Sequence, residues 1–363
     1  MARQLESDRI LFAAVVVLVL LGALMVFSSS AVMAAERYGS SYHFLVRQVA
    51  WAGIGLAAMV AIMNLDYRRL CHPLVVFPAV GLQLILLVAV LFAPTTNNAH
   101  RWLALGPVGF QPSELTKVVL VLFLAYFLQT RKGAINDWKH TLLPIGLVAG
   151  VSVLLVVKEP DLGTSLAILL IVAAMLFAAG LRAAYFAYAA LAALPLLYLL
   201  VFRVGYRYKR ILAFLDPYAD PLGKGFQIIQ SFIAVGTGGI SGVGLMEGKQ
   251  KLFYLPEPHT DFIFAVIGEE LGFLGALAVL GLFGVILWRG LRASAGCSDE
   301  FGRLLAIGLT VMLVGQALVN MSVVLGLLPT KGIPLPLVSY GGSSLLMSLV
   351  AVGVLLNISQ HSS

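Results

Sequence analysis

Long apolar runs are the feature that most restricts how this chain can fold. Apolar segments of about 18 residues or more recur, from Ile10–Phe27 near the start to a run close to the C-terminal end. Each of them is long enough to cross about 30 Å of hydrocarbon as an α-helix. The runs are continuous and do not alternate between apolar and polar residues, which argues against a transmembrane β-barrel. The sequence therefore predicts an all-α polytopic membrane protein.

Composition supports this class. Hydrophobic residues make up 60% of the chain and charged residues 11%, whereas a soluble domain carries about 25% charged residues. The first run follows Arg3 and Arg9 and precedes the small residues AVMAA, as in a secretory signal peptide. Its apolar core is longer than the usual 7–15 residues or so and further spans follow, so we interpret it as a retained first helix.

We predict a single transmembrane domain over residues 1–363 with ten spans. An even number of spans places both termini on one side of the membrane. Lys and Arg are more frequent in the connections on that side, which favours termini in the cytoplasm. The predicted spans cover about 10–32, 45–64, 73–93, 113–130, 142–157, 162–180, 184–202, 262–288, 303–328 and 342–358. The basic residues on the terminus side are Arg3, Arg9, Arg68, Arg69, Arg131, Lys132, Lys139, Arg182, Arg289, Arg292 and Arg303.

One large segment before the eighth span, about 203–261, is predicted to be extracytoplasmic. Within it, FQIIQSFIAVG (226–236) is apolar but too short to span, so we expect it to be interfacial or re-entrant. The adjoining GTGGISGVG (236–244) does not match a dinucleotide fingerprint, and GKQ (248–250) does not complete a P-loop. The formal net charge of +7 is dispersed over loops without a basic, aromatic-rich stripe, so nucleic acid is not an expected partner.

Two polar clusters on the side opposite the termini follow the third and fifth predicted spans. In RWLALGPVGFQPSELTK (101–117), Glu114 and Lys117 are three residues apart and share one helical face. They form either a local ion pair at the helix start, or a site at which Lys117 binds phosphate. In KEPDLGT (158–164), the favoured role of Asp161 is to cap the next helix.

The segment HTDFIFAVIGEE (259–270) places carboxylates beside and inside an apolar run, where ionisable groups are functional hypotheses by default. If Thr260 caps the helix, Asp261 lies in its first turn and the macrodipole lowers its pKa. Desolvation would instead raise that pKa, and the sequence leaves both alternatives open. Glu269 and Glu270 point about 100° apart on a helix, so they cannot share one partner. We expect at least one of them to pair with a cation from another span.

The fourth cluster, KGIPLPLVSYGGSSLL (331–346), is a rigid irregular turn before the last span, and it carries the hydroxyls of Ser339, Tyr340, Ser343 and Ser344. Together the four clusters predict one extracytoplasmic cavity with a candidate base and several cations, suited to an amphiphilic substrate with an anionic head. Cys71 and Cys297 lie far apart and no histidines have ligand spacing, so neither a disulfide framework nor a metal motif is predicted.

The motifs QPSELTK, EPDLGT, DPLGKGFQIIQS, QKLFYLPEPHTDFIFAVIGEELG and PLPLVSYGGSS, in this order and spacing, resemble the SEDS family of bacterial cell-wall proteins (FtsW, RodA and SpoVE). The likeness covers nearly the whole chain. The segment around HTDF is most similar to the division branch, FtsW.

This resemblance implies a peptidoglycan glycosyltransferase that polymerises lipid II at the outer face of the bacterial cytoplasmic (inner) membrane. It implies a class B penicillin-binding protein (a transpeptidase) and other divisome or elongasome proteins as partners, and a divalent cation, Mg²⁺ or Mn²⁺, as cofactor. Asp261 matches the aspartate of HTDF and is implied as the catalytic general base or a metal ligand. Two alternatives stay open: a lipid II flippase, and a non-catalytic scaffold for the transpeptidase. The implied substrate-binding residues are Arg101, Gln111, Ser113, Glu114, Lys117, Asp161, Arg210, Lys249, His259 and Ser339.

Overall fold

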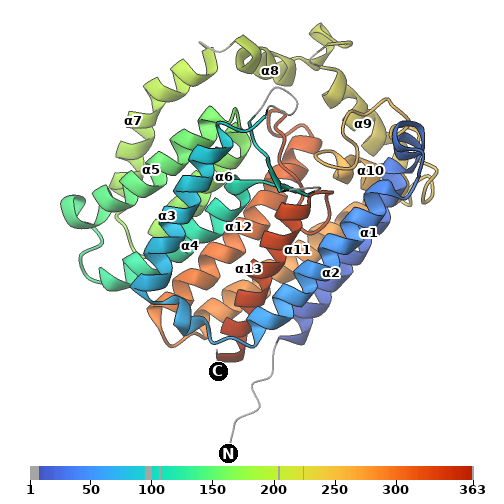
Figure 1. Ribbon diagram of the computed structural model, residues 1–363. Coiled ribbons are helices and arrows are strands. Elements are labelled where there is room, and N and C mark those ends of the chain that lie inside the picture. The colour runs from blue at the N-terminus through green and yellow to red at the C-terminus, as the bar shows by residue number, and fades with distance from the viewer. Residues whose placement is uncertain (1–7, 95–99, 106–107, 203–204, 224, 362–363) are drawn as a thin grey trace, which may run out of the picture.

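The computed structural model describes residues 8–94, 100–105, 108–202, 205–223 and 225–361, and it is a helical bundle (Figure 1). Thirteen α-helices and a small antiparallel hairpin are found in the described residues. The elements are α1 (Arg9–Tyr38), α2 (His43–Met63), η1 (Tyr67–Leu70), α3 (Pro73–Val90), β1 (Leu103–Leu105), β2 (Val108–Phe110), α4 (Pro112–Thr130), η2 (Trp138–Leu142), α5 (Leu143–Lys158), α6 (Leu162–Ala178), α7 (Ala183–Phe202), α8 (Gly205–Leu215), η3 (Pro217–Ala219), α9 (Phe226–Gly238), α10 (Ile263–Glu270), α11 (Gly272–Ala295), α12 (Glu300–Val324) and α13 (Gly342–His361).

The prediction of an all-α polytopic membrane protein is confirmed. Eight helices of the described chain are long and apolar enough to cross a membrane: α1, α2, α3, α4, α5 with η2, α11, α12 and α13. The sixth and seventh predicted spans correspond to α6, which has 17 residues, and to α7, whose apolar described part is also short. α1 begins and α13 ends at the same end of the bundle (Figure 1), as an even number of spans requires. We call the opposite end the loop face.

Three helices, α4, α12 and α13, form the buried centre of the bundle. α2 packs along α13, while α4 and α6 pack against α12. The contact between α2 and α13 is close, because a Cβ atom added at Gly353 would lie 2.8 Å from the Met59 carbonyl oxygen. The central helix α12 carries buried polar side chains along its apolar length, and two of them, Gln316 and Asn320, lie four residues apart on one face.

The large segment before the eighth predicted span is not a plain loop. It contains α8 and α9, which cross the loop face of the bundle, and α7 at the edge leads into α8 (Figure 1). The short apolar stretch predicted to be interfacial or re-entrant forms α9, which packs against α10. Its Ser231 hydroxyl donates a hydrogen bond to the Val324 carbonyl oxygen at 2.7 Å, so it is fixed to the end of α12.

The predicted eighth span, 262–288, is wrong as a single helix. The chain breaks into α10 and α11 at Leu271, and Gly272 adopts a φ of +66°. The glycine-rich segment after α9 runs alongside the break, where the Val243 N–H donates to the Glu269 carbonyl at 3.0 Å and the Phe273 N–H donates to the Gly239 carbonyl at 2.9 Å. Non-helical backbone is tolerated within a membrane protein here because these N–H and carbonyl groups hydrogen-bond to one another inside the protein.

Candidate active site

A cavity of about 320 Å³ lies at the loop face where the four polar clusters were expected to meet. Its wall combines carboxylates (Asp261 and Glu257) with cations (Arg101, Arg210 and Lys331). The complete lining is Arg101, Trp102, Arg210, Gln227, Glu257, Asp261, Phe262, Thr330, Lys331 and Gly332. A cavity that holds both signs of charge can bind an anionic group beside a carboxylate that accepts a proton.

Asp261 is held in place through its backbone. The Asn320 side-chain amide donates to the Asp261 carbonyl at 2.8 Å and to the Ile333 carbonyl at 2.7 Å, which ties two loops to α12. The preceding carbonyl, of Thr260, accepts the Ser339 hydroxyl at 2.5 Å. The carboxylate itself lies against Gly332, since a Cβ atom there would be 2.9 Å from Asp261 Oδ2.

The proposed helix cap at Thr260 is wrong, because α10 begins at Ile263 and lacks a side-chain cap. Asp261 therefore lies before the helix rather than in its first turn. Burial raises the pKa of Asp261 to about 7, with the Glu257 and Asp161 carboxylates adding to the rise and Arg101 and Arg210 opposing it. Of the two alternatives for this pKa, desolvation is the one that the geometry supports. A carboxyl that titrates near neutral pH is suited to general-base catalysis.

Arg101 joins the cavity to the turn between α5 and α6. Its guanidinium donates to the Glu159 carbonyl at 3.2 Å and the Pro160 carbonyl at 2.5 Å, and lies 4.0 Å from Asp161 Oδ2. Asp161 accepts hydrogen bonds from the Thr164 N–H at 3.0 Å and hydroxyl at 2.9 Å, so its predicted role as a helix cap is confirmed. The Glu159 carboxyl is fully buried. Burial and the Asp161 charge raise its pKa to about 8, so Glu159 is protonated at neutral pH.

Lys117 and Glu114 form the local ion pair that their spacing predicted. The Lys117 ammonium lies 2.9 Å from Glu114 Oε1, both side chains are buried, and the ammonium also donates to Gln316 Oε1. The Gln316 amide continues this network by donating to the Pro334 carbonyl at 2.9 Å. Neither Lys117 nor Glu114 lines the cavity. Phosphate binding by Lys117 stays a prediction, and it would require this network to open.

Gln111, Ser113, His259 and Ser339, which were also predicted to bind substrate, do not line the cavity. The Gln111 amide donates to the Ser113 hydroxyl at 3.0 Å and lies 3.4 Å from Asp161 Oδ2. The centroid of the buried His259 ring lies 4.6 Å from that of the Phe44 ring. Burial lowers the pKa of His259 to about 4. His259 is therefore neutral at physiological pH.

Lys249 lies away from the cavity, on an exposed stretch of the loop before α10. Its backbone N–H donates to Glu269 Oε1 at 2.8 Å. The neighbouring Glu270 accepts hydrogen bonds from the Lys251 ammonium at 2.6 Å and from the Ser28 hydroxyl at 2.7 Å. The prediction that one of these glutamates pairs with a cation is confirmed. The prediction that the cation comes from another span is wrong, because Lys251 lies in the loop before α10. These two glutamates fasten the loop to α10 and α1.

Comparison with known proteins assigns this arrangement to a family. The FtsW/RodA/SpoVE family model, described as "Cell cycle protein", matches residues 8–363. The chain belongs to this family. The chain is 45% identical to "Probable peptidoglycan glycosyltransferase FtsW" of Geobacter sp. (strain M18), over 98% of both sequences. It is 43% identical to "Stage V sporulation protein E" of Bacillus subtilis (strain 168), over 99% of both.

Solved structures of the FtsW/RodA/SpoVE type share the fold. A structure described as "Structural coordination of polymerization and crosslinking by a peptidoglycan synthase complex" has a TM-score of 0.80 and 36% identity, with 97% of both chains covered. The rod-shape-determining protein RodA of Thermus thermophilus has a TM-score of 0.72 and 30% identity, and the match covers 99% of this chain and 98% of that one.

The described residues of this family member do not supply a protein-only metal centre. No group of three or more His, Cys, Asp or Glu side chains within them is arranged to hold a metal ion. Asp261 and Glu257 are the two carboxylates on the cavity wall. Mg²⁺ is commonly held by one or two carboxylates together with substrate phosphates. Asp261 and Glu257 could bind Mg²⁺ in this way, with the substrate supplying the other ligands.

Among the residues at the site that the sequence did not single out, Lys331, Glu257 and Asn320 bear most on its chemistry. Asn320 carried a readable signal, because two amides four residues apart in an apolar helix predict a buried polar face. Lys331 and Glu257 lie in irregular loops, where periodicity gives no direction for a side chain.

Proposed function

We propose that this chain is a peptidoglycan glycosyltransferase that polymerises lipid II at the outer face of the cytoplasmic membrane. The observation that carries the proposal is the Asp261 carboxyl, with a pKa of about 7, in a cavity that three cationic side chains share. Support comes from relatives of 45% and 44% identity that carry the name "Probable peptidoglycan glycosyltransferase FtsW".

In the proposed reaction, a sugar hydroxyl of one substrate attacks the anomeric carbon of another. The hydroxyl proton passes to the Asp261 carboxylate, the new glycosidic C–O bond forms, and the bond between the anomeric carbon and the pyrophosphate oxygen breaks. The electron pair leaves with the polyprenyl pyrophosphate. A positioned base contributes about 10²–10⁴-fold to such a transfer, and preorganised cations stabilise the charge that develops on the leaving oxygen.

The cavity residues divide naturally between these tasks. Asp261 acts as the base, and Arg101, Arg210 and Lys331 face the leaving pyrophosphate. A divalent cation, Mg²⁺ or Mn²⁺, remains part of the proposal: Asp261 and Glu257 would hold it together with substrate phosphate, and it would supply further positive charge. Lys117 contributes indirectly, by holding Gln316 and with it the Pro334 carbonyl.

The proposal includes orientation and partners. The loop face lies outside the cell and both termini lie in the cytoplasm, in agreement with the distribution of Lys and Arg. A class B penicillin-binding protein and other divisome or elongasome proteins are the proposed partners, supported by the likeness to a chain from a peptidoglycan synthase complex. A flippase mechanism that uses Glu269 and Glu270 as relays is less well supported, because backbone N–H groups, Ser28 and Lys251 already occupy both carboxylates.

The Asp261→Asn variant tests the proposal, because it keeps the size of the side chain but removes the base. Purified with its transpeptidase partner and given lipid II, it should lose at least about 10²-fold in polymerisation rate. Glu247→Gln is the control, since Glu247 is an exposed acid on the same loop that does not line the cavity. Polymerisation by Asp261→Asn at the wild-type rate would refute the catalytic assignment. Transfer of lipid II across vesicles without polymer would favour a flippase.

A further inference from the structure

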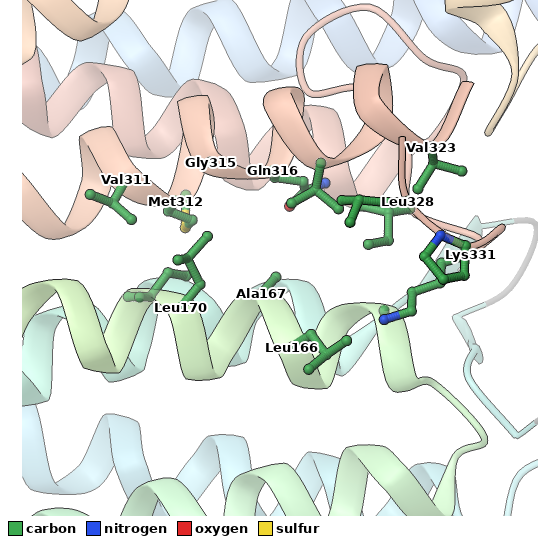
Figure 2. A pocket seen from close by; sticks show the side chains of 15 residues that line it. Leu166, Ala167, Leu170, Val311, Met312, Gly315, Gln316, Val323, Leu328 and Lys331 are labelled. Atoms are coloured by element: carbon green, nitrogen blue, oxygen red, sulfur yellow. The ribbon is translucent and has the colours of Figure 1, made fainter. Parts of the chain in front are cut away.

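An apolar groove runs along the outside of the bundle between α6 and α12, and Figure 2 shows its side chains. It has a volume of about 200 Å³. Leu166, Ala167 and Leu170 line it from α6, and Val311, Met312 and Val323 are among its residues from α12. From residue 311 to residue 323, a helix rises by about 18 Å. The groove therefore covers roughly the half of a 30 Å hydrocarbon layer nearest the loop face.

The groove and the polar cavity share one side chain. Lys331 lies at the loop-face end of the groove (Figure 2), opposite the end marked by Val311 and Met312. It also lines the cavity that holds Asp261. The two sites thus adjoin at Lys331, and the candidate catalytic carboxylate lines the second of them.

The Lys331 ammonium is available to a ligand. Within the described part of the chain, it has no ion pair and no hydrogen bond, in contrast to Lys117 and Lys251, which are both paired. Lys331 is half-buried, and burial lowers its pKa. A cation that is partly withdrawn from water without a partner is unfavourable, and an anion that binds there reduces this cost.

We infer that this groove and Lys331 form the binding site for the polyprenyl pyrophosphate of the donor substrate, with the isoprenoid chain between α6 and α12 and the pyrophosphate at Lys331. The inference rests on the proposed function for the identity of the donor. It places the leaving group at the cavity wall next to Gly332, the residue against which the Asp261 carboxylate lies.

Charge distinguishes this ligand from an ordinary phospholipid. A phosphodiester carries one negative charge. The pyrophosphate of the donor, which is esterified at both ends, carries two, and the monoester that leaves carries more, so several cations stabilise it. The end of the groove offers Lys331, and the same cavity adds Arg101 and Arg210. The apolar length of the groove suits either lipid, so the pyrophosphate is the part that the site selects.

The test measures binding directly, without polymerisation. The wild-type protein in lipid nanodiscs is titrated with geranylgeranyl pyrophosphate, geranylgeranyl monophosphate, inorganic pyrophosphate and phosphatidylglycerol. Geranylgeranyl pyrophosphate should bind most tightly. Lys331→Gln should weaken it by about tenfold, as expected from the loss of one charge-assisted contact, and Lys331→Arg should restore most of the affinity. Lys158→Gln, which removes an exposed cation at the end of α5 outside both sites, should have no effect.

A second pair of variants tests the groove. Leu166→Trp adds bulk at a partly exposed position on the groove wall, and Leu169→Trp adds the same bulk on α6 outside it. Leu166→Trp should weaken both geranylgeranyl ligands and leave inorganic pyrophosphate unchanged, while Leu169→Trp should change none of them. A benzophenone-tagged isoprenoid pyrophosphate should cross-link to α6 or α12.

Three results would overturn the inference: equal competition by phosphatidylglycerol, cross-links confined to other helices, or unchanged affinity in both Lys331→Gln and Leu166→Trp. If Lys331→Gln does not fold, the Leu166→Trp pair and the cross-links still decide. A protein that binds the pyrophosphate here but does not polymerise lipid II would refute the proposed function alone. One that polymerises it without binding at this groove would refute this inference alone.

Discussion

At the scale of single residues, the raised pKa of Asp261 links the proposed activity to stability. Its pKa in the folded protein is about 7, above the ordinary value of 3.8, chiefly because the carboxyl is buried. The folded protein therefore binds this proton more tightly than the unfolded chain does. This preference stabilises the fold below pH about 4 and is lost as pH rises from there to about 7.

We therefore expect the polymerisation rate to rise with pH and to reach half of its maximum near pH 7. Stability should change in the opposite direction. The melting temperature of Asp261→Asn should exceed that of the wild type at pH 8, and the difference should shrink towards pH 5. Differential scanning fluorimetry of both proteins across this range measures the trend, and a difference that does not vary with pH would contradict the raised pKa.

The buried pair of Lys117 and Glu114 gives a second prediction at this scale. Lys117→Met leaves the Glu114 carboxylate buried without its cation, which costs about 3–5 kcal/mol of folding free energy. The double variant Lys117→Met with Glu114→Met should recover most of the lost thermal stability. If the pair has only a structural role, polymerisation should recover as well. A stable double variant without activity would instead support direct phosphate binding by Lys117.

At the scale of elements, the break between α10 and α11 positions the site. α10 is only eight residues long, yet all of its residues are buried. Asp261 lies just before its first turn and the Glu269–Glu270 anchor lies at its last. Both ends are fixed, one by Asn320 and Ser339 and the other by Lys251. A continuous span could not make the backbone contacts with the glycine-rich segment that follows α9.

Glycine substitutions test this element. At Gly272 a Cβ atom would lie 2.3 Å from the Gly242 backbone nitrogen, and the residue has a φ of +66°. Gly272→Ala should therefore destabilise the protein, reducing its free energy of unfolding by at least about 1–3 kcal/mol. Gly281→Ala is the control: it lies within α11 with open space around it, so it should be neutral or stabilising by up to about 1 kcal/mol. Similar melting temperatures for the two variants would contradict the described break.

Hydropathy located the helices because a span must bury its backbone and supply about 20 apolar residues, and both requirements are local. It could not locate the break at Leu271, because that run is apolar on both sides. Of the two partners of Lys117, only Glu114 was predictable, because it lies one helical turn away. Gln316 is 199 positions distant in the sequence. Likewise, Lys331 meets the cavity through a loop whose path depends on Asn320.

At the scale of the whole molecule, the two ends of the bundle differ in chemistry. The loop face carries the cavity, its three cations and the segment from α8 to α10. The opposite end carries the first residue of α1 and the last of α13, with ion pairs such as Arg289–Asp8 that join neighbouring helices. An enzyme of this shape can act only on the side to which its loop face is turned.

Cysteine labelling in intact cells tests this orientation. In a variant without Cys71 and Cys297, a cysteine at Leu222 should react with a membrane-impermeant maleimide added from outside, since Leu222 is 89% exposed at the loop face. A cysteine at Ala295, on the exposed end of α11, should react only after the membrane is permeabilised. The reverse pattern would invert the proposed topology and place the cavity in the cytoplasm.

The contact between Gly332 and Asp261 has a consequence for antibiotic resistance. Any side chain added at position 332 would press on the Asp261 carboxylate, with its first carbon 2.9 Å from Oδ2. The nearby Asp261 and Ile333 carbonyls are held as backbone groups by Asn320. An inhibitor that fills the space above Gly332 would therefore contact atoms that a point mutation cannot replace without disturbing the carboxylate. Escape by target mutation should be rarer for such a compound than for one that relies on the side chain of Trp102, which also lines the cavity.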